Sequence, residues 1–189
     1  MDDRIEQLNS ERKGGENVFL LGMTGAGKST VALLLTNIAS MYSCKRYAHD
    51  QRFIICDMRE KISTIDSQSK TKVPEVLHSP ELGATVYDCP GFADTNFTDE
   101  LTSAYFIKHA LDTSSKVKFL LVAPFHTLQS GGNRHYLSNL LIHIVRTVKN
   151  VEKYADSFAL AVTFGNPLHP TSHEPHRQLC RWIPARIFG

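Results

Sequence analysis

Residues 22–29 read Gly22-Met23-Thr24-Gly25-Ala26-Gly27-Lys28-Ser29 and fit the phosphate-loop pattern G-x-x-x-x-G-K-[ST] at every defined position. The apolar run 17–21 precedes this stretch, and the helix-like run 30–35 follows it. The motif requires this order of strand, loop and helix. A glycine-rich turn that matches by chance is the alternative, but such a turn needs only one or two glycines and no lysine-serine pair after them.

The residues of this loop have expected roles in holding a nucleotide. Glycines let successive backbone N–H groups turn inward around a phosphate, and the positive end of the following helix adds to their field. We expect Lys28 to reach the β- and γ-phosphates and to act in catalysis, and the Ser29 hydroxyl to bind Mg²⁺. The expected nucleotide-binding residues in this region are Gly22, Met23, Thr24, Gly25, Ala26, Gly27, Lys28, Ser29 and Thr30.

A second motif ends the strand-like run 84–88, where the sequence continues Asp88-Cys89-Pro90-Gly91. An aspartate at the C-terminal end of a strand parallel to the loop strand lies where open α/β sheets bind ligands. Asp88 can there hold Mg²⁺, usually through water, opposite Ser29. Gly91 lets the backbone approach a γ-phosphate, so we count it among the nucleotide-binding residues. Taken without the loop, Asp88 would be read as a turn or capping residue.

Composition indicates one ordinary soluble domain of 189 residues, with 42% hydrophobic and 21% charged residues. The net charge of +2 and the scattered lysines and arginines give no support to nucleic-acid binding. No apolar run approaches the roughly 18 residues that cross a bilayer, so we expect no membrane segment or signal peptide. The four cysteines lack C-x-x-C spacing. We therefore expect no disulfide framework and a reducing, cytoplasmic setting.

The alternation of strand-like and helix-like segments predicts an α/β fold of three layers, a mostly parallel sheet flanked by helices. We expect a polar leader over 1–16, a partial nucleotide-binding domain over 17–165 and an irregular tail over 166–189. The expected strands are 17–21, 52–56, 73–77, 84–88, 116–124 and 158–163, with 73–77 at an edge because it contains Pro74. The expected helices are 29–42, 99–111 with Thr98 as N-cap, and 134–148.

The phosphate loop and the motif at 88–91 together resemble the first and third motifs of translation-factor-related P-loop GTPases, over Val18 to about Gly165. Within that class, Ser69-Lys70-Thr71-Lys72 is similar to the S-x-T-K pattern of the immunity-associated nucleotide-binding proteins, close relatives of septins. The resemblance implies that Thr71 is a switch threonine that reaches Mg²⁺ and the γ-phosphate and acts in catalysis. Two other residues stay open as its counterpart, Thr64 and Ser67.

The sequence departs from the GTPase pattern at the position that orients the attacking water. Many small GTPases have a glutamine directly after the glycine of the third motif, and this chain has Phe92. A phenyl ring cannot orient water, so we expect slow hydrolysis, although Thr24 faces the γ-phosphate position and is another polar group there. The resemblance implies acceleration when two nucleotide faces meet in a homodimer.

A second departure concerns recognition of the base. After the strand 158–163 the sequence runs Thr163-Phe164-Gly165-Asn166, which keeps the threonine of [NT]-K-x-D but lacks its lysine and aspartate. Asn166 cannot accept hydrogen bonds from both guanine N–H groups as a carboxylate can. Guanine preference is thus an expectation from the resemblance, and adenine stays open.

Histidines outside these motifs favour packing over metal binding. His135 and His143 lie eight residues apart on the predicted helix 134–148 and are read as surface or packing residues. The tail has four prolines and matches no strong zinc pattern, and the last elements of a GTPase domain are missing from it. The tail residues that suggest a metal by composition alone are His169, His173, His176 and Cys180.

The sequence therefore predicts a Mg²⁺-dependent protein that binds GTP and GDP, hydrolyses GTP slowly and acts as a switch or assembles through its nucleotide face. A homodimer or a protein effector is the expected partner, since missing sheet elements leave surface for one to cover. A non-catalytic scaffold with a degraded base site is the first alternative. An ATP-binding P-loop protein is the second, and a phosphotransferase is disfavoured because an arginine-rich lid is lacking.

Overall fold

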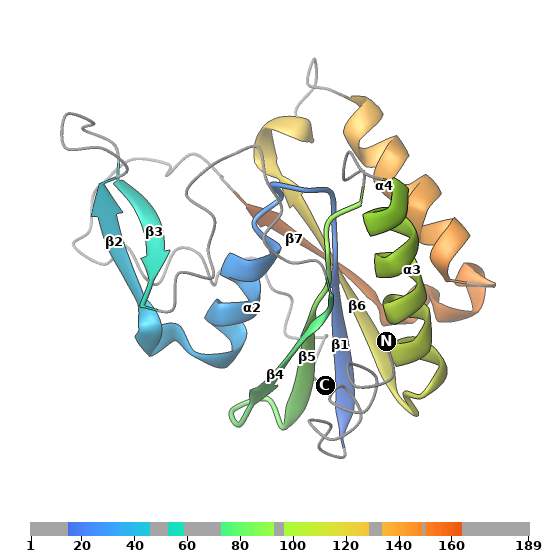
Figure 1. Ribbon diagram of the computed structural model, residues 1–189, viewed down its shortest axis with the longest axis horizontal. Helices are drawn as coiled ribbons and strands as arrows, with labels where there is room; N and C mark the ends of the chain where they lie inside the picture. Colours follow the sequence, from blue (N-terminus) through green and yellow to red (C-terminus); the bar gives the residue numbers. More distant parts are fainter. Residues whose placement is uncertain are drawn as a thin grey trace.

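The central sheet of this computed structural model has five strands in the order β4-β5-β1-β6-β7 (Figure 1). The structure describes residues 15–45, 53–58, 73–92, 97–128, 134–148 and 150–163. Strands β5, β1, β6 and β7 run parallel, and β4 pairs antiparallel with β5. The strands are β1 (Glu16–Leu21), β4 (Glu75–Ser79), β5 (Ala84–Asp88), β6 (Val117–Pro124) and β7 (Phe158–Thr163). The mostly parallel α/β sheet is confirmed, with the Pro74-preceded strand at its edge.

Helices cover both faces of the sheet and complete the three layers (Figure 1). Helix α2 (Lys28–Thr36) lies on one face, and helices α3 (Phe97–Asp112) and α4 (Arg134–Thr147) lie on the other. Three short 3₁₀ turns are η1 (Ile38–Ser40), η2 (Phe125–Thr127) and η3 (Val151–Ser157). Among the described residues, no helix has the length and apolar character needed to span a membrane.

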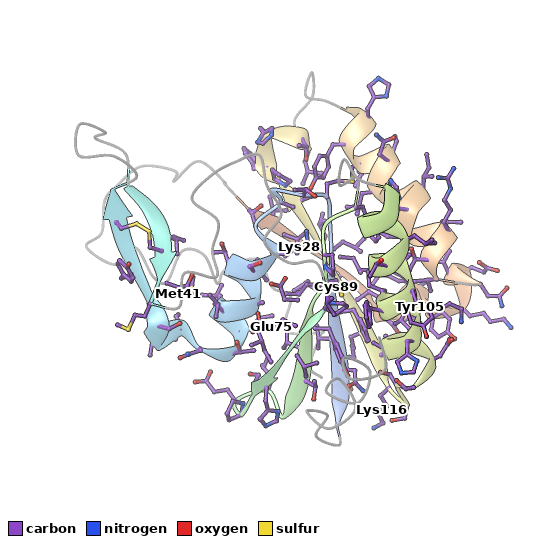
Figure 2. All side chains as sticks on the ribbon, viewed as in Figure 1. Lys28, Met41, Glu75, Cys89, Tyr105 and Lys116 are labelled. Carbon is purple, nitrogen blue, oxygen red and sulfur yellow. A yellow bond between two sulfur atoms is a disulfide. The ribbon has the colours of Figure 1, made fainter. Side chains whose placement is uncertain are left out.

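Strand β1 lies at the centre because its side chains are buried on both faces. Val18 and Leu20 pack with residues of α2, whereas Phe19 and Leu21 pack with residues of α3 and α4. Each of these four residues is at most 1% exposed. Cys89, just after β5, is fully buried in the second cluster and lies near the middle of the sheet in Figure 2. A near-continuous apolar run is what a strand covered on both faces requires.

A row of aromatic rings crosses four strands on the face that α3 and α4 cover. The Phe19 ring stacks on Tyr87 with centroids 4.4 Å apart, and Phe119 stacks on Phe158 at 4.5 Å. Phe19 and Phe119 join the two pairs at 6.1 Å. These residues are direct register partners across β5, β1, β6 and β7. Because aromatic pairs contribute about 0.5–1.5 kcal/mol each beyond area burial, the row favours this register over any shifted one.

Helix α2 ends at Thr36, so the prediction that it continues to about Tyr42 is wrong. Asn37 leaves helical geometry with φ −155° and ψ 62°, while its N–H still donates to the Leu33 carbonyl at 2.7 Å. The Ser79 hydroxyl of β4 donates to the Leu35 carbonyl at 2.6 Å. These bonds satisfy carbonyls at the helix end that have no partner within the helix. The apolar periodicity that predicted the helix did not reveal this tertiary cap.

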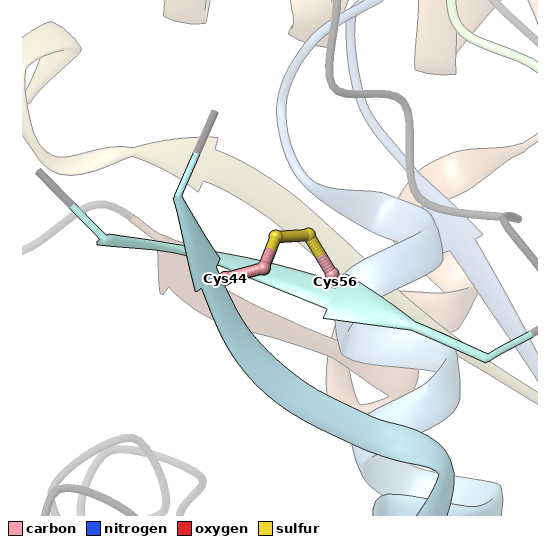
Figure 3. The surroundings of a disulfide bond; sticks show 2 residues. All are labelled: Cys44 and Cys56. Atoms are coloured by element: carbon pink, nitrogen blue, oxygen red, sulfur yellow. A yellow bond between two sulfur atoms is a disulfide. The ribbon is translucent and has the colours of Figure 1, made fainter. Parts of the chain in front are cut away.

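The residues after this helix form a hairpin, which the sequence prediction missed on its first strand. Strand β2 (Met41–Lys45) pairs antiparallel with β3 (Phe53–Asp57), with Cys44 opposite Ile54 and Tyr42 opposite Cys56. A disulfide joins Cys44 to Cys56 across the two strands, with their Cα atoms 6.0 Å apart (Figure 3). The expectation of no disulfide is therefore wrong for this pair, and the reducing compartment inferred with it stays a prediction. Strand pairing sets the contact, and sequence spacing did not show it.

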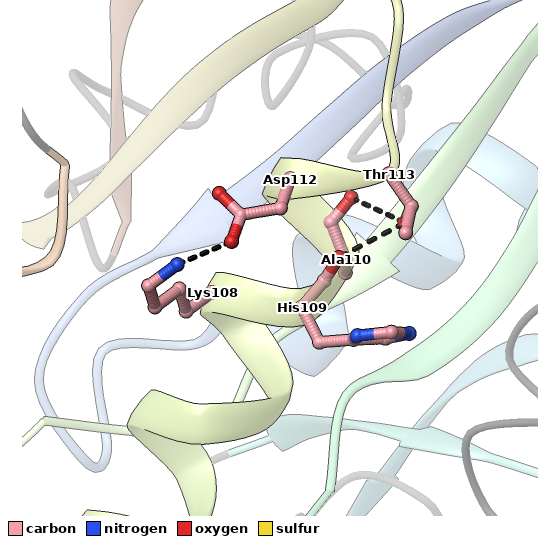
Figure 4. Close-up of polar contacts among 5 residues, drawn as sticks. All are labelled: Lys108, His109, Ala110, Asp112 and Thr113. Atoms are coloured by element: carbon pink, nitrogen blue, oxygen red, sulfur yellow. Dashed lines mark hydrogen bonds and ion pairs between the residues drawn. The ribbon is translucent and has the colours of Figure 1, made fainter.

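Helix α3 ends in a cluster of local polar contacts, which Figure 4 shows. The single O–H of Thr113 is shared between the carbonyls of His109 at 2.9 Å and Ala110 at 3.2 Å, and so supplies a donor at the helix end. Lys108 forms an exposed ion pair with Asp112 one turn on, a type that adds only a few tenths of a kcal/mol. The helix begins at Phe97, so the prediction of Thr98 as N-cap is wrong. The other predicted strands and helix 134–148 are confirmed with bounds shifted by two residues at most.

The hairpin disulfide makes a prediction for the hairpin's stability. Cys44 and Cys56 are 12 positions apart, and closing a loop of that length stabilises a chain by about 3 kcal/mol in the chain-entropy model. We expect reduction to speed hydrogen exchange of the β2 and β3 amides while those of β1 and β6 keep their protection. Exchange read by mass spectrometry checks this.

The matched control is the double variant Cys44→Ser/Cys56→Ser, whose exchange should resemble that of the reduced protein and should not respond to reductant. Peptide mapping without reductant should recover the two cysteines in one linked peptide pair. Alkylation of both thiols in the unreduced, folded protein would contradict the pairing.

Candidate functional site

The loop between β1 and α2 has a shape that requires its glycines. Gly25 and Gly27 have φ angles of 77° and 87°, in the left-handed region that favours glycine. Gly22 has a different constraint, because a Cβ atom there would lie 2.6 Å from the Val122 carbonyl oxygen of β6. The glycines of the motif therefore stand at the positions where a residue with a side chain would strain the backbone.

The Lys28 side chain connects the end of this loop to its start. It is only 7% exposed, and its Nζ donates to the carbonyls of Gly22 at 3.1 Å and Met23 at 3.0 Å. A protonated ammonium has three donors and no acceptor, so it suits this position between carbonyl oxygens. The interaction fixes the start of the loop relative to its end and places a buried positive charge under it.

The start of α2 favours an anion. Gly27 is the residue before the helix, and the first turn contains Lys28, Ser29 and Thr30 but no acidic side chain. The unpaired N–H groups of a helix start carry a partial positive charge, which an acidic side chain would otherwise neutralise. This geometry, together with the left-handed glycines, is that of a phosphate-binding loop.

Asp88 lies at the same edge of the sheet as this loop. It is the register partner of Leu20 in the parallel pairing of β5 with β1, and it is 2% exposed. Burial raises the pKa of the neighbouring Cys89 thiol, the Asp88 charge raises it further, and the Lys28 charge lowers it. Both charges thus act at one point of the sheet, where Figure 2 shows Lys28 and Cys89 close together.

The segment after Asp88 is docked on the loop by its backbone. Phe92 forms a parallel bridge with Met23. Its N–H donates to the Gly22 carbonyl at 3.1 Å, and its carbonyl accepts from the Thr24 N–H at 3.2 Å. A Cβ on Gly91 would lie 2.6 Å from the Thr24 Cα and 2.7 Å from its N. Gly91 therefore lies directly against the loop residue expected to face the γ-phosphate.

Strand β7 also reaches the loop, through Thr163. Its hydroxyl is buried and donates to the Ala26 carbonyl at 2.7 Å. The one residue that the sequence keeps from the base-recognition pattern is thus tied to the phosphate loop. Residues 164–166, which carry the two departures from that pattern, lie outside the described residues.

The structure brings together most of the predicted site residues. The loop residues 22–30, Asp88 and Gly91 lie at the carboxyl ends of β1 and β5, as predicted. Thr71 and its alternatives Thr64 and Ser67 lie outside the described residues, as do the histidines and the cysteine of the tail.

Oxygen atoms are the possible metal ligands at this edge of the sheet. The Ser29 hydroxyl and the Asp88 carboxylate are hard ligands of the kind that Mg²⁺ prefers, so the residues fit that ion. In the part of the chain that the structure describes, no group of three or more His, Cys, Asp or Glu residues could hold a metal by itself.

Two residues of α4 that lie beside the loop had no predicted role in the site. The Phe92 ring stacks on His143, which confirms that this histidine is a packing residue and gives it a specific contact. Tyr136 packs against both core clusters. Their separation of two helical turns is the signal that the sequence offered, but it does not distinguish a site-facing residue from an ordinary core residue.

Comparison with known proteins gives likeness to solved structures only. No protein-family model matches the chain, and no curated protein matches it. A solved structure of the G domain of the T. maritima FeoB iron transporter is similar over 79% of this chain and 87% of that one, at 14% identity and a TM-score of 0.34. A likeness at this level does not establish a function for this chain.

The contact of Gly91 with Thr24 predicts that alanine is not accommodated at position 91. Gly91→Ala would force the segment off the loop, and we expect the free energy of unfolding to fall by about 2–3 kcal/mol. Urea denaturation measures this, and the amides of Thr24 and Phe92 should lose protection from exchange.

Gly25→Ala is the matched control. A Cβ there meets nothing within 4 Å, so only its left-handed φ opposes alanine, at about 1–2 kcal/mol. The Thr24 and Phe92 amides should keep their protection in this variant. Wild-type stability and protection in Gly91→Ala would show that the segment is not docked as described.

Proposed function

We propose that this protein binds a nucleoside triphosphate with Mg²⁺ at the loop 22–30 and acts as a slow nucleotide-dependent switch. One observation carries the proposal: parallel pairing of β1 with β5 places the loop and Asp88 at one edge, with Lys28 buried between loop carbonyls. A buried lysine, a helix N-terminus without acidic side chains and hard oxygen ligands together match the charge of a metal–triphosphate.

The roles within the site follow from this chemistry. The loop amides and Lys28 would hold the phosphates, and Ser29, Asp88 and Thr71 would hold Mg²⁺. The ion would neutralise charge that builds up on the phosphate oxygens. Gly91 would sense the γ-phosphate through its backbone, since that backbone already lies against Thr24.

The proposed hydrolysis is in-line attack of water on the γ-phosphate, with the charge stabilised by Lys28 and the loop amides. The Phe92 ring has no polar group that could orient a water molecule. It is also only 7% exposed and is held in place by the stack on His143. We therefore propose turnover on the order of 10⁻³ s⁻¹ or slower for the isolated chain.

Guanine is the proposed base, and it rests on the resemblance to P-loop GTPases. ATP is the alternative ligand, because residues 163–166 lack the aspartate that reads guanine. Homodimerisation through the nucleotide face, or binding of a protein effector, is proposed on the resemblance. A scaffold without nucleotide is the rival, and the left-handed glycines and the buried Lys28 favour binding over it.

The proposal predicts saturable binding of nucleotides in the presence of Mg²⁺. We expect fluorescent guanine nucleotides to bind with higher affinity than adenine nucleotides, and Lys28→Ala to weaken binding at least 100-fold, because it removes a buried charge-assisted contact of about 3 kcal/mol. Ser29→Ala should weaken nucleotide binding measured with Mg²⁺ more than nucleotide binding measured without it.

The matched control is Lys116→Ala, which removes an exposed lysine just before β6, at the opposite end of the strands from the loop. Its affinity should equal that of the wild type. Saturable binding that prefers adenine nucleotides would favour the ATP-binding alternative over guanine. If neither kind of nucleotide binds saturably, the proposal fails and the non-catalytic scaffold is the remaining alternative.

A further inference from the structure

Helix α4 presents two aromatic residues to the phosphate loop and to the segment docked on it. Tyr136 and His143 are seven positions apart, which places them on one face of the helix. Each contacts one partner of the bridge between Met23 and Phe92. No role in nucleotide binding has so far been given to either residue.

The contact of His143 is with the side chain of Phe92. The two rings are stacked, with centroids 5.2 Å apart and planes at 6°. Phe92 is held at its backbone by Gly22 and Thr24, so the residue has the loop on one side and α4 on the other. A displacement of the Phe92 ring must therefore change either the stack or the two backbone bonds.

The contact of Tyr136 is with the loop itself. Its hydroxyl is buried beside the backbone of Met23 but, among the described residues, makes no hydrogen bond of normal geometry. Burial raises the pKa of Tyr136 to about 12, although the Met23 backbone acts in the opposite direction. Tyr136 therefore supports the loop by packing and stays neutral over the physiological pH range.

We propose that His143 is a positioning residue for the γ-phosphate contact, acting through the Phe92 ring. It holds Phe92, and with it Gly91, against Thr24 at the phosphate end of the loop. Presence or loss of the γ-phosphate would thereby act on helix α4 through Phe92 and His143. The outer face of this helix exposes Leu141, Ile142 and Val145. The ligand part of this proposal, that His143 affects binding of the γ-phosphate, rests on the proposed function. The mechanical part, that His143 holds Phe92 and Gly91 against Thr24, concerns the protein alone.

The mechanical part is tested without nucleotide, by hydrogen exchange at the two amides of the docked segment. The Phe92 and Thr24 N–H groups donate across the interface, so their exchange reports its opening. A stacked aromatic pair shifts such an equilibrium about 2- to 10-fold. We expect His143→Ala to speed exchange at both amides by that factor and His143→Phe to restore wild-type rates.

The control is His135→Ala, which changes an exposed histidine in the first turn of the same helix. It should leave both rates unchanged, and the Asn17 amide, which donates to Lys116 at the other end of β1, should be unchanged in all variants. Unchanged rates at Thr24 and Phe92 in His143→Ala would overturn the proposal. So would equal acceleration at Asn17, because it would show a purely global loss of stability.

The ligand part is tested by comparing affinities for the guanosine di- and triphosphate. We expect His143→Ala to weaken triphosphate binding about 2- to 10-fold and to leave diphosphate binding unchanged, with rescue by His143→Phe. An equal change for both ligands, or tighter triphosphate binding, would contradict a role at the γ-phosphate. If the wild type binds neither ligand, the proposed function fails while the exchange experiment still decides the mechanical part.

Discussion

Parallel pairing of β1 with β5 is the constraint on which the rest of the site depends. Parallel neighbours end at the same edge of a sheet, so the register that sets Leu20 beside Asp88 also sets the phosphate loop beside the segment 88–92. The register is fixed by burial on both faces of β1 and by the aromatic row that contains Phe19. A shift of one residue would turn every one of these side chains to the wrong face. Packing far below the loop therefore determines which groups meet at it.

Contacts among the chain's own residues set the shape of the loop. Lys28 joins two carbonyls at its start, Gly25 and Gly27 adopt the required left-handed angles, and Phe92 bridges to Met23 from the side. A site that is ordered before binding loses less conformational freedom when the ligand arrives. The same contacts connect the loop to β7 through Thr163 and to α4 through Phe92. These neighbours link the loop to elements far away in the sequence.

Sequence patterns predicted the parts of the structure that local rules govern. The motif at 22–29 and the breaker after Asp88 predicted the loop, and continuous apolar runs predicted β1, β6 and β7, because strands covered on both faces need such runs. The end of α2, the hairpin and the Cys44–Cys56 bond were not predicted, since each depends on a partner distant in sequence, such as Ser79 for the helix end. The stack of His143 on Phe92 was missed for the same reason. Periodicity shows that a residue faces the core but not which residue it meets there.

In the proposed site, the amides of residues 25–29 bind phosphate with Asp88 beside them. The most direct measurement is an NMR titration of the ¹⁵N-labelled protein with Mg²⁺ and a non-hydrolysable guanosine triphosphate analogue. We expect large, saturable shifts of the Gly25, Gly27, Lys28 and Ser29 amides, with smaller shifts in β4 at the edge of the sheet. Saturable shifts elsewhere that leave these four amides unchanged, or no shifts at millimolar ligand, would contradict it.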